Sequence, residues 1–409
     1  MDKIAVTGIG VVSPLGCDAG ILWENLVQGN SGISPVDALE GLSVTFGGRA
    51  KDFDPSRYLG QKELRHLDLY AQMAITSGLD AYSLSRITSY TYPENRIGVL
   101  VGTGAGGISS LEQQIHNFNT RGPRRVSPLT VPMFIPNIAS GVLSQRIGAK
   151  GPGMGVSSAC ATGGHAISIA SRLIQTGDAD CMLAGGVEAC LTPFGVTAFA
   201  NMKALSVRNN EPSRASRPFD KDRDGFVISE GGAVLVLERY TAAKQRGARV
   251  YGVLSGFGMT QDAYHMVAPD PEGHAVVYAM DQAIKDAGVS PRDIGYINAH
   301  GTSTLLNDKI ETLAIKKVFK DHADSVRISS TKSMTGHLIG GASSLEAVIC
   351  MMAMENGVLP PTINLENPDP ECDLDYIPNK PVNADVSCCM NNSFGFGGQN
   401  VSMVVQKDL

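Results

Sequence analysis

Several features that would assign a chain to a specialised class are missing from these 409 residues. No apolar run approaches the roughly 18 to 20 residues that a membrane-spanning helix needs. No long basic run is present, and the formal charge is −6 with both signs mixed along the chain. We therefore expect neither a membrane nor a nucleic acid as the main partner. The N-terminus reads directly as a strand and a turn, so no targeting peptide is expected, and the cytoplasm is the predicted location.

The eight cysteines show no pattern of a metal site, a redox motif or a disulfide framework. They are scattered and include no Cys-x-x-Cys pair, so we expect reduced thiols and no bound metal. Cys388 and Cys389 are adjacent in sequence, and such neighbours are poorly placed to bond to each other. We predict that this pair packs within a strand.

Hydrophobic residues make up 43% of the sequence, which is enough for a large core. Short apolar segments punctuated by glycine alternate with longer segments of helical periodicity, a pattern typical of α/β proteins. No low-complexity tract or long flexible linker divides the chain. The clearest strands are expected at residues 4–7, 97–101, 181–184, 233–237 and 296–298.

Two sequence echoes indicate an internal duplication. Residues 4–10 are similar to residues 252–258, and residues 157–165 are similar to residues 330–337. Both echoes place the second copy after about residue 250. We predict two similar halves, each with a sheet flanked by helices.

A glycine-rich segment at residues 102–107 follows a predicted strand and fits the dinucleotide fingerprint G-x-G-x-x-G in form. A nucleotide site also needs an acidic residue at the end of a second strand, about 20 residues further on. That region contains Arg121, Arg124 and Arg125 instead. We therefore interpret the segment as a tight turn, or as a place where the backbone approaches the acyl chain of a ligand.

Cys160 is the candidate nucleophile. It lies between an apolar approach and a run of small residues, directly before a segment of helical periodicity at residues 166–174. A cysteine at a helix N-terminus is close to free amides and to the positive end of the helix dipole, which favour the thiolate. We therefore expect a lowered pKa for Cys160. Plain packing of a buried cysteine is the alternative.

Three further motifs contain residue types that carry chemistry. His300 follows a predicted strand in the sequence Asn-Ala-His-Gly-Thr-Ser-Thr. Lys332 and His337 share the segment Ser-Thr-Lys-Ser-Met-Thr-Gly-His, and Phe396 lies in the segment Asn-Asn-Ser-Phe-Gly-Phe-Gly-Gly. Each histidine alone could simply satisfy backbone groups of its loop.

Together with Cys160, these motifs resemble those of the β-ketoacyl-[acyl carrier protein] synthases, of the elongating type and most similar to synthase II, in the thiolase-like superfamily. The motifs occur in the order and approximate spacing of that family, and the resemblance extends over essentially the whole chain. It implies an α/β protein with a duplicated thiolase-like α-β-α-β-α layered fold. The N-terminal half, residues 1–250, would carry Cys160, and the C-terminal half, residues 251–409, would carry His300 and His337. The family works as a homodimer.

The resemblance also implies a decarboxylative Claisen condensation. An acyl chain moves from the partner, acyl carrier protein, to Cys160; malonyl on a second carrier then loses CO2 and attacks the acyl thioester. Neutral His300 and His337 would donate to the developing enolate oxygen, and the amides of Cys160 and Phe396 would form an oxyanion hole. No cofactor of the chain itself is required, because the phosphopantetheine belongs to the carrier protein.

Further roles follow from the same resemblance. Lys332 would act electrostatically with Glu346 as its partner, and Asp308 would support the site. Phe396 would be a gate, with Asp262 and His265 in a second mobile loop. Phe394, Gly395 and Gly397 complete the gate segment. Ala105 replaces a bulkier aliphatic residue that is common at the bottom of the acyl pocket, and Thr130 replaces an aromatic residue that is common at its dimer-facing wall, so we expect a deep pocket. The residues expected to dock the acidic carrier protein are Lys62, Arg65, Arg124, Arg125 and Lys203.

Five alternative functions compete with this one. An inactive chain-length partner is disfavoured, because such subunits replace the cysteine that is present here as Cys160. A polyketide ketosynthase would share the fold and the triad. A cysteine hydrolase would have no use for a second histidine, and a carrier-protein scaffold would need no triad. Condensing enzymes that start chains from acyl-CoA use Cys-His-Asn, whereas His337 occupies the third position here.

Overall fold

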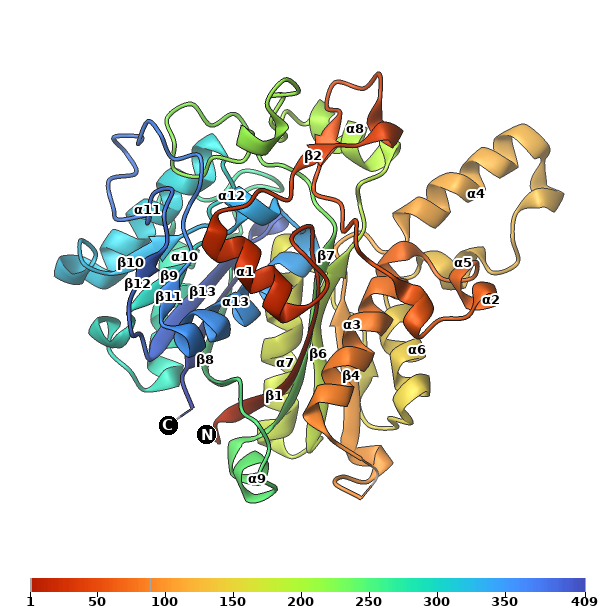
Figure 1. Cartoon of the computed structure of the whole chain (residues 1–409), viewed down its shortest axis with the longest axis horizontal. Helices are drawn as coiled ribbons and strands as arrows, with labels where there is room; N and C mark the ends of the chain where they lie inside the picture. The colour runs from red at the N-terminus through yellow and green to blue at the C-terminus, as the bar shows by residue number, and fades with distance from the viewer. Residues whose placement is uncertain (1, 89, 409) are drawn as a thin grey trace.

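The computed structural model describes residues 2–88 and 90–408, and its central feature is a mixed sheet that runs through the whole molecule (Figure 1). Its strands are β1 (Ile4–Val12), β4 (Ile97–Gly102), β5 (Gly153–Met154), β6 (Cys181–Glu188), β7 (Gly231–Arg239), β8 (Gly252–Gln261), β9 (Tyr296–Asn298), β10 (Arg327–Ser329), β13 (Cys388–Phe394) and β14 (Gln399–Gln406). They lie in the order β10-β9-β13-β14-β8-β1-β7-β6-β4-β5. The five strands expected from the sequence are thereby confirmed.

The sheet consists of two halves with the same topology. In the first half the order from the edge inward is β5-β4-β6-β7-β1, and in the second it is β10-β9-β13-β14-β8. In each half the outer three strands are parallel and the remaining pairings are antiparallel. The halves meet where β1 and β8 pair antiparallel, with Ile4 opposite Leu254. The predicted duplication is confirmed.

Helices cover both faces of each half. α7 (Thr162–Thr176) and α13 (Ala342–Asn356) contact each other and pack against the strands of their own halves. α3 (Leu69–Ser85) and α6 (Ile138–Ile147) cover the outer face of the first half, and α10 (His274–Ala287) covers that of the second, beside α11 (Leu305–Phe319). Figure 1 shows α7 and α13 between these outer helices. This arrangement is the predicted α-β-α-β-α layering.

The remaining elements lie around this framework. The other helices are α1 (Ala19–Gln28), α2 (Gln61–Leu64), α4 (Ile108–Arg121), α5 (Thr130–Phe134), α8 (Pro193–Asn201), α9 (Tyr240–Gln245) and α12 (Lys332–Thr335). Two short sheets pair β2 (Ser34–Pro35) with β3 (Phe46–Gly47) and β11 (Val358–Leu359) with β12 (Val382–Asn383). The boundary expected at residue 250 falls between α9 and β8.

The two central helices begin in the same unusual way. A three-residue 3₁₀ turn leads directly into each: η5 (Ala159–Ala161) before α7 and η9 (Ile339–Gly341) before α13. The first residue of each turn has a positive φ, 49° at Ala159 and 45° at Ile339. Cys160 therefore corresponds to Gly340. The echo of residues 157–165 in residues 330–337 is wrong in register, because glycine-rich turns resemble one another.

Two simpler expectations can also be compared with the structure. Cys388 and Cys389 are buried in β13, and all eight cysteines, each within the described residues, are free thiols. Among the helices of residues 2–88 and 90–408, none is both long and apolar enough to cross a membrane.

Candidate active site

Cys160 occupies a strained turn at the start of a central helix. It is the middle residue of η5, and its side chain is buried, with 5% of its surface exposed. The preceding Ala159 holds φ at 49°, a conformation that non-glycine residues adopt rarely and at a cost. Such strain is common where a fold fixes the direction of a reactive side chain.

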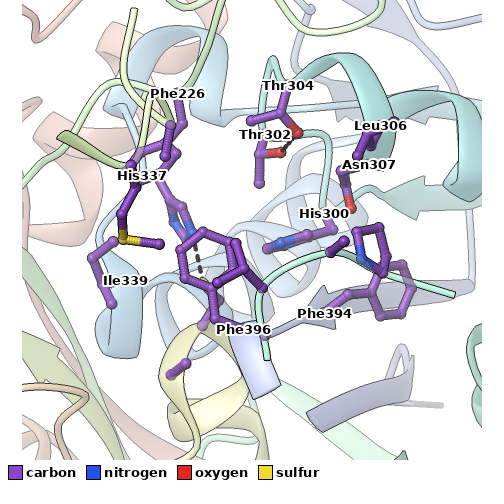
Figure 2. A pocket seen from close by; sticks show the side chains of 18 of the residues that line it. Phe226, His300, Thr302, Thr304, Leu306, Asn307, His337, Ile339, Phe394 and Phe396 are labelled. Atoms are coloured by element: carbon purple, nitrogen blue, oxygen red, sulfur yellow. Dashed lines mark hydrogen bonds between the residues drawn. The ribbon is translucent and has the colours of Figure 1, made fainter. Parts of the chain in front are cut away.

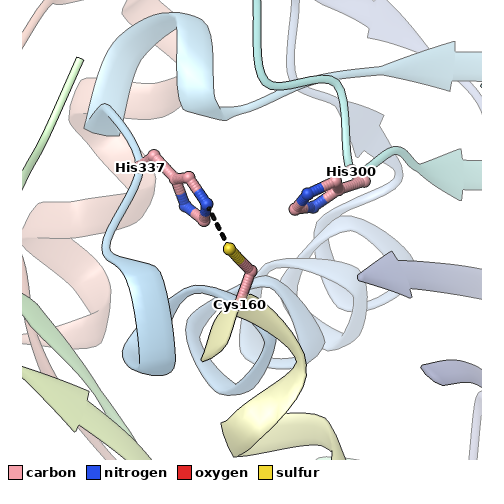
Figure 3. Close-up of side chains that lie close together, drawn as sticks. All are labelled: Cys160, His300 and His337. Atoms are coloured by element: carbon pink, nitrogen blue, oxygen red, sulfur yellow. Dashed lines mark hydrogen bonds between the residues drawn. The ribbon is translucent and has the colours of Figure 1, made fainter. Parts of the chain in front are cut away.

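Two histidines from the other half of the sheet converge on this sulfur (Figure 3). His337 follows α12, and its Nε2 lies 3.0 Å from Sγ of Cys160. His300 follows β9, and its ring centre lies 5.5 Å from that of His337 at an interplanar angle of 83°. One side-chain atom from each of the three residues lies within 4.8 Å of the other two. The fold thus assembles the predicted triad from segments 177 positions apart.

The electrostatics of Cys160 differ from the sequence prediction. Burial raises the pKa of this thiol to about 12. The charge of Lys332 and the backbone amides of Phe396 and Cys160 lower it by smaller amounts. The prediction of a lowered pKa is therefore wrong, because the sequence reveals the helix start but not the depth of the side chain.

Both histidines are held neutral. Burial lowers the pKa of His300 and of His337 well below the ordinary value, and the charge of Lys332 adds to this effect. A neutral imidazole nitrogen accepts a hydrogen bond better than a thiol sulfur does. The Cys160 thiol therefore donates to Nε2 of His337, which makes His337 the acceptor of the thiol proton.

A raised pKa predicts how alkylation of Cys160 responds to pH. Below the pKa the thiolate fraction rises about tenfold per pH unit. The rate of modification by iodoacetamide should therefore increase from pH 7 to pH 9.5 without a plateau. Peptide mass spectrometry resolves Cys160 from the other thiols, with Cys160→Ser as the blank. A plateau between pH 6 and pH 8 would instead support the thiolate inferred from the sequence.

Lys332 lies beneath the triad as a buried cation. Its side chain is 1% exposed, and Nζ donates to Oε1 of Glu346 in α13. Burial raises the pKa of Glu346 to about 7, and Lys332 opposes this rise. The structure therefore brings together the pair that the family resemblance implied.

A second buried carboxylate holds the His300 loop, and the sequence analysis missed it. Glu311 accepts hydrogen bonds from the backbone amides of His300 and Gly301, both at 2.8 Å. Burial raises its pKa to about 7. Asp308, which was expected to support the site, instead accepts from the Phe219 amide at 2.8 Å and pairs with Arg223. The available signal was a second acidic residue one turn beyond Asp308 on the same face of this helix.

The gate segment approaches the nucleophile turn from β13. Its turn is η10 (Phe396–Gly398), and the Phe396 amide is close enough to Sγ of Cys160 to lower the thiol pKa. A side chain on Gly395 would place Cβ 2.8 Å from the Ser158 carbonyl oxygen, and Gly397 has a φ of 82°. Both positions therefore require glycine. The Phe394 ring centre is 5.6 Å from that of His300.

A cavity of 470 Å³ is lined by Cys160, His300, His337 and Phe396 (Figure 2). Its walls are largely apolar, as a site for an acyl chain requires. The predicted site residues that line it are Ala105, Cys160, Lys203, Asp262, His265, His300, His337, Phe394, Gly395 and Phe396. Thr130 was expected at the pocket wall, but it begins α5 and donates to the Ser127 carbonyl outside this cavity. Because Thr130 was expected at the wall that faces the partner of a dimer, its place in the pocket stays a prediction.

The glycine-rich segment after β4 forms part of the cavity wall through Ala105. The buried Glu188 accepts from Oγ1 of Thr103 at 2.9 Å and from the amides of Gly104 and Gly340, at 2.7 and 3.2 Å. Because these groups of the segment are bonded to a buried carboxylate, the segment serves as a wall of the cavity. The sequence analysis missed Glu188 because its partners lie in distant segments.

The second gate loop is hydrogen-bonded to the first. Asp262 accepts from Nδ2 of Asn400 at 2.6 Å, and its own amide donates to the Gly398 carbonyl at 2.9 Å. The Gly397 amide donates to the Met266 carbonyl at 2.8 Å. Nδ1 of His265 accepts from two amides within its own loop. The two loops can therefore move only together, or after these bonds break.

The expected docking residues are all exposed. Lys203 stands beside the cavity. Lys62 and Arg65 lie at α2, and Arg124 and Arg125 lie in the turn that follows α4. The structure thus leaves these five basic side chains available to a partner.

Four buried oxygens near Lys332 have no hydrogen-bond partner among residues 2–88 and 90–408. They are Oδ1 of Asn298, Oε2 of Glu346, Oδ1 of Asn391 and Oγ of Ser393. Asn298 and Asn391 are opposite each other in β9 and β13. Oxygen donors of this kind suit a hard cation. This is where the chain could hold one, since the cysteine pattern argued only against a zinc or redox site.

Comparisons with known proteins agree with this geometry. The family model described as "Beta-ketoacyl synthase, N-terminal domain" matches residues 1–243, and the corresponding C-terminal model matches residues 251–366. The 3-oxoacyl-[acyl-carrier-protein] synthase 2 of Synechocystis sp. is 46% identical over 407 residues, which cover 99% of this chain and 98% of the relative. The protein of the same name from Coxiella burnetii is 45% identical with the same coverage. A solved ketosynthase, in a complex described as a type II PKS acyl-carrier protein with its ketosynthase bound to the hexaketide, superposes with a TM-score of 0.92 at 34% identity, covering 100% of both chains.

Proposed function

The chain belongs to the beta-ketoacyl synthase family, and we propose that it condenses an acyl chain with malonyl-acyl carrier protein to give 3-oxoacyl-acyl carrier protein and CO2 in fatty acid elongation. The observation that carries this proposal is the 3.0 Å contact between Cys160 and His337 in a cavity that His300 also lines. The identities of 45–46% to relatives named 3-oxoacyl-[acyl-carrier-protein] synthase 2 support the reaction.

In the first half-reaction Cys160 takes the acyl chain from the carrier thioester. His337 accepts the thiol proton as sulfur attacks the carbonyl, so the raised pKa of the free thiol is overcome at the moment of reaction. The amides of Cys160 and Phe396 donate hydrogen bonds that stabilise the negative charge developing on the carbonyl oxygen. The carrier thiolate then leaves and takes the proton from His337, which restores neutral imidazole beside an acyl-enzyme.

In the second half-reaction the malonyl group loses CO2 and its carbon becomes the nucleophile. The enolate oxygen accepts hydrogen bonds from His300 and His337, which are both neutral and so close together that two cations would repel. His337 donates here as the Nε2–H tautomer, because acylation has removed the thiol proton that its Nε2 accepted before. The enolate carbon attacks the acyl thioester on Cys160. The cysteine thiolate leaves and takes up one proton from water, which is the proton that the decarboxylative condensation consumes overall, and the 3-oxoacyl product stays on the carrier.

The partner and the assembly belong to the same proposal. The carrier protein supplies the phosphopantetheine, so no cofactor is needed in the chain, and the five exposed basic residues offer an acidic partner complementary charge. A homodimer is supported by apolar side chains left exposed on α4 and β5, including Ile115, Phe118 and Met154. We place the protein in the cytoplasm.

Polyketide elongation is the second candidate, because a structural neighbour with a TM-score of 0.92 is a ketosynthase in complex with a polyketide carrier protein. Its identity of 34% is lower than the 46% shared with the 3-oxoacyl-[acyl-carrier-protein] synthase 2 of Synechocystis sp.. The product separates the two reactions, since a polyketide synthase would extend its own 3-oxoacyl product repeatedly.

Intact-protein mass spectrometry tests the proposal. The protein is incubated with a long-chain acyl-carrier protein and then with malonyl-carrier protein, beside a Cys160→Ala control. We expect the acyl mass on Cys160, followed by its loss to a 3-oxoacyl-carrier product two carbons longer. Release of free acid would support a cysteine hydrolase. Failure to load would support a non-catalytic scaffold.

Pocket depth gives a prediction of its own. Ala105 lines the cavity, so Ala105→Phe should place a ring in the path of a long acyl chain. We expect the rate with long primers to fall by about 100-fold and the rate with short primers to change little. Rates over a primer series measure this. Ala38→Phe is the matched control, because Ala38 is exposed and does not line the cavity. An unchanged chain preference in Ala105→Phe would show that the pocket does not end at Ala105.

A further inference from the structure

Part of the cavity wall is built from two segments that belong to different halves of the fold. One is the glycine-rich segment after β4, which contributes Gly104 and Ala105, and the other is η9, which contributes Ile339 (Figure 2). The segments lie in contact, because a Cβ on Gly104 would be 3.2 Å from Cγ2 of Ile339 and a Cβ on Gly340 would be 2.6 Å from the Gly104 amide nitrogen. The space left to an acyl chain therefore depends on how the two segments are held together.

A single buried carboxylate bonds to both segments. Glu188 ends β6, and none of its surface is exposed. From the glycine-rich segment it accepts hydrogen bonds from Oγ1 of Thr103 at 2.9 Å and from the amides of Gly104 and Ala105 at 2.7 and 3.3 Å. From η9 it accepts a bond from the Gly340 amide at 3.2 Å. Its Oε2 receives the bonds of both Gly104 and Gly340, so one oxygen atom joins the two segments.

These four partners suit a carboxylate and no other side chain of the same shape. Each of them donates, and an ionised carboxylate has about four acceptor sites. A side-chain amide instead has one acceptor oxygen, with two lone pairs, and an NH2 group that only donates. A glutamine in place of Glu188 would therefore leave at least two of the donors without an acceptor and would turn its own NH2 group toward them. The two wall segments would then lose the atom that joins them.

We propose that Glu188 is a positioning residue that determines which acyl chains the cavity admits, because it holds the Ala105 segment against the Ile339 turn. Since none of its own surface is exposed, Glu188 acts through these wall residues and not by contact with the acyl chain. This role rests on the proposed function, because the wall selects acyl chains only if Cys160 is acylated. Selectivity for chain length then has a determinant outside the cavity.

A double-mutant cycle with Ala105→Phe tests this role. Ala105→Phe is expected to slow acylation by long primers about 100-fold, because the wall holds the new ring in the path of the chain. In Glu188→Gln the segment that carries residue 105 is released, so the ring can be displaced. We expect Ala105→Phe to slow long primers by about 10-fold or less in that background, a coupling of about 10-fold between residues in contact. Rates of Cys160 acylation by short and long acyl-carrier proteins measure both values.

Glu238→Gln is the matched control background. Glu238 is also fully buried, but it lies opposite Cys181 at the start of β6, whereas Glu188 ends that strand. It pairs with Arg246, so its replacement should lower the free energy of unfolding. The block of about 100-fold by Ala105→Phe should nevertheless remain in this background. A general loss of stability therefore cannot imitate the expected coupling.

Two further measurements complete the experiment. Thr103→Val removes one donor to Glu188 with little change of shape, and it should relieve the block by Ala105→Phe in the same direction, by about threefold. This variant carries the test if Glu188→Gln does not fold. Alkylation of Cys160 by iodoacetamide should be at least as fast in Glu188→Gln as in the wild type, because the charge of Glu188 raises the pKa of this thiol.

The possible results separate this role from the proposed function. If Ala105→Phe blocks long primers equally in the wild-type and Glu188→Gln backgrounds, or blocks them in neither, Glu188 does not determine which chains enter. Slower alkylation together with slower acylation by every primer in Glu188→Gln would show a disturbed nucleophile turn, and it would also overturn the role. If wild-type Cys160 itself is alkylated but never acylated, the proposed function fails, and the role of Glu188 fails with it.

Discussion

Replacing His337 with alanine should lower kcat/KM for condensation by at least about 10³-fold. The variant loses the acceptor of the thiol proton, a contribution of about 10²–10⁴-fold, and also one donor to the enolate oxygen. The loss should be visible in the first half-reaction, because a thiol with a pKa of about 12 has no other base at 3.0 Å. Stopped-flow or quenched measurements of acyl-enzyme formation give this rate directly.

His300→Ala is the informative comparison. His300 belongs to the same cluster, but the hydrogen bond from Cys160 goes to His337. We expect His300→Ala to keep most of the acylation rate and to lose about 10²–10³-fold in the malonyl step. His116→Ala, at an exposed position on α4, should change neither. Equal loss of acylation in His300→Ala and His337→Ala would contradict the assignment of His337 as the proton acceptor.

Replacing Lys332 with methionine should lower the free energy of unfolding by about 1–2 kcal/mol at pH 8, because the buried Glu346 carboxyl loses its cation and must stay protonated. Urea unfolding measures the change. Lys150→Met is the matched control, since Lys150 and Glu94 form a pair whose side chains are 69% and 51% exposed. Loss of that pair should cost no more than about 1 kcal/mol.

The loss of unfolding free energy in Lys332→Met should grow as pH rises. The pKa of Glu346 in the folded protein, about 7, lies above its ordinary 4.5. Between these values the folded state holds a proton that the unfolded state has released, so stability falls as pH rises. Without Lys332 the pKa rises further and the fall continues beyond pH 7. The variant should therefore be close to the wild type at pH 5.5 and about 1.4 kcal/mol less stable at pH 8, one unit above the wild-type pKa of Glu346.

A double variant makes the cause explicit. Lys332→Met combined with Glu346→Gln removes both charges, and it should recover most of the stability at pH 8. Equal destabilisation of the single variant at pH 5.5 and pH 8 would mean that lost packing, rather than an unpaired carboxylate, accounts for the effect.

The fold could be predicted from the sequence to the level of layers and halves. Apolar segments such as residues 4–7 and 181–184 are long enough and regular enough to be recognised as strands, and residues 4–10 and 252–258 indeed form β1 and β8 at the same place in the two halves. The register of the second echo could not be predicted. Cys160 and Gly340 occupy equivalent positions in η5 and η9, but the two turns have no similarity of side chains that would reveal this in the sequence.

The site residues that lie in a local sequence motif could be predicted. The residues whose role depends on contacts between distant segments could not. Cys160, His300 and His337 were identified by local sequence, and the family matches confirm the resemblance. Glu311 and Glu188 were missed because their partners are backbone amides, which no sequence pattern displays. The direction of the Cys160 pKa was wrong for a related reason, since burial is a property of the folded state.

The correspondence of Cys160 and Gly340 also bears on how a repeated fold divides its tasks. The first copy of the turn presents a thiol, whereas in the second copy Ile339 faces the cavity and Gly340 donates its amide to Glu188. The turn that is equivalent to the nucleophile turn thus carries no reactive group and forms part of the cavity wall instead. Variation at the second turn is therefore free to alter which chains the cavity admits, whereas variation at the first would end the chemistry. Specificity and reactivity can thus evolve at equivalent positions of one ancestral design without interfering with each other.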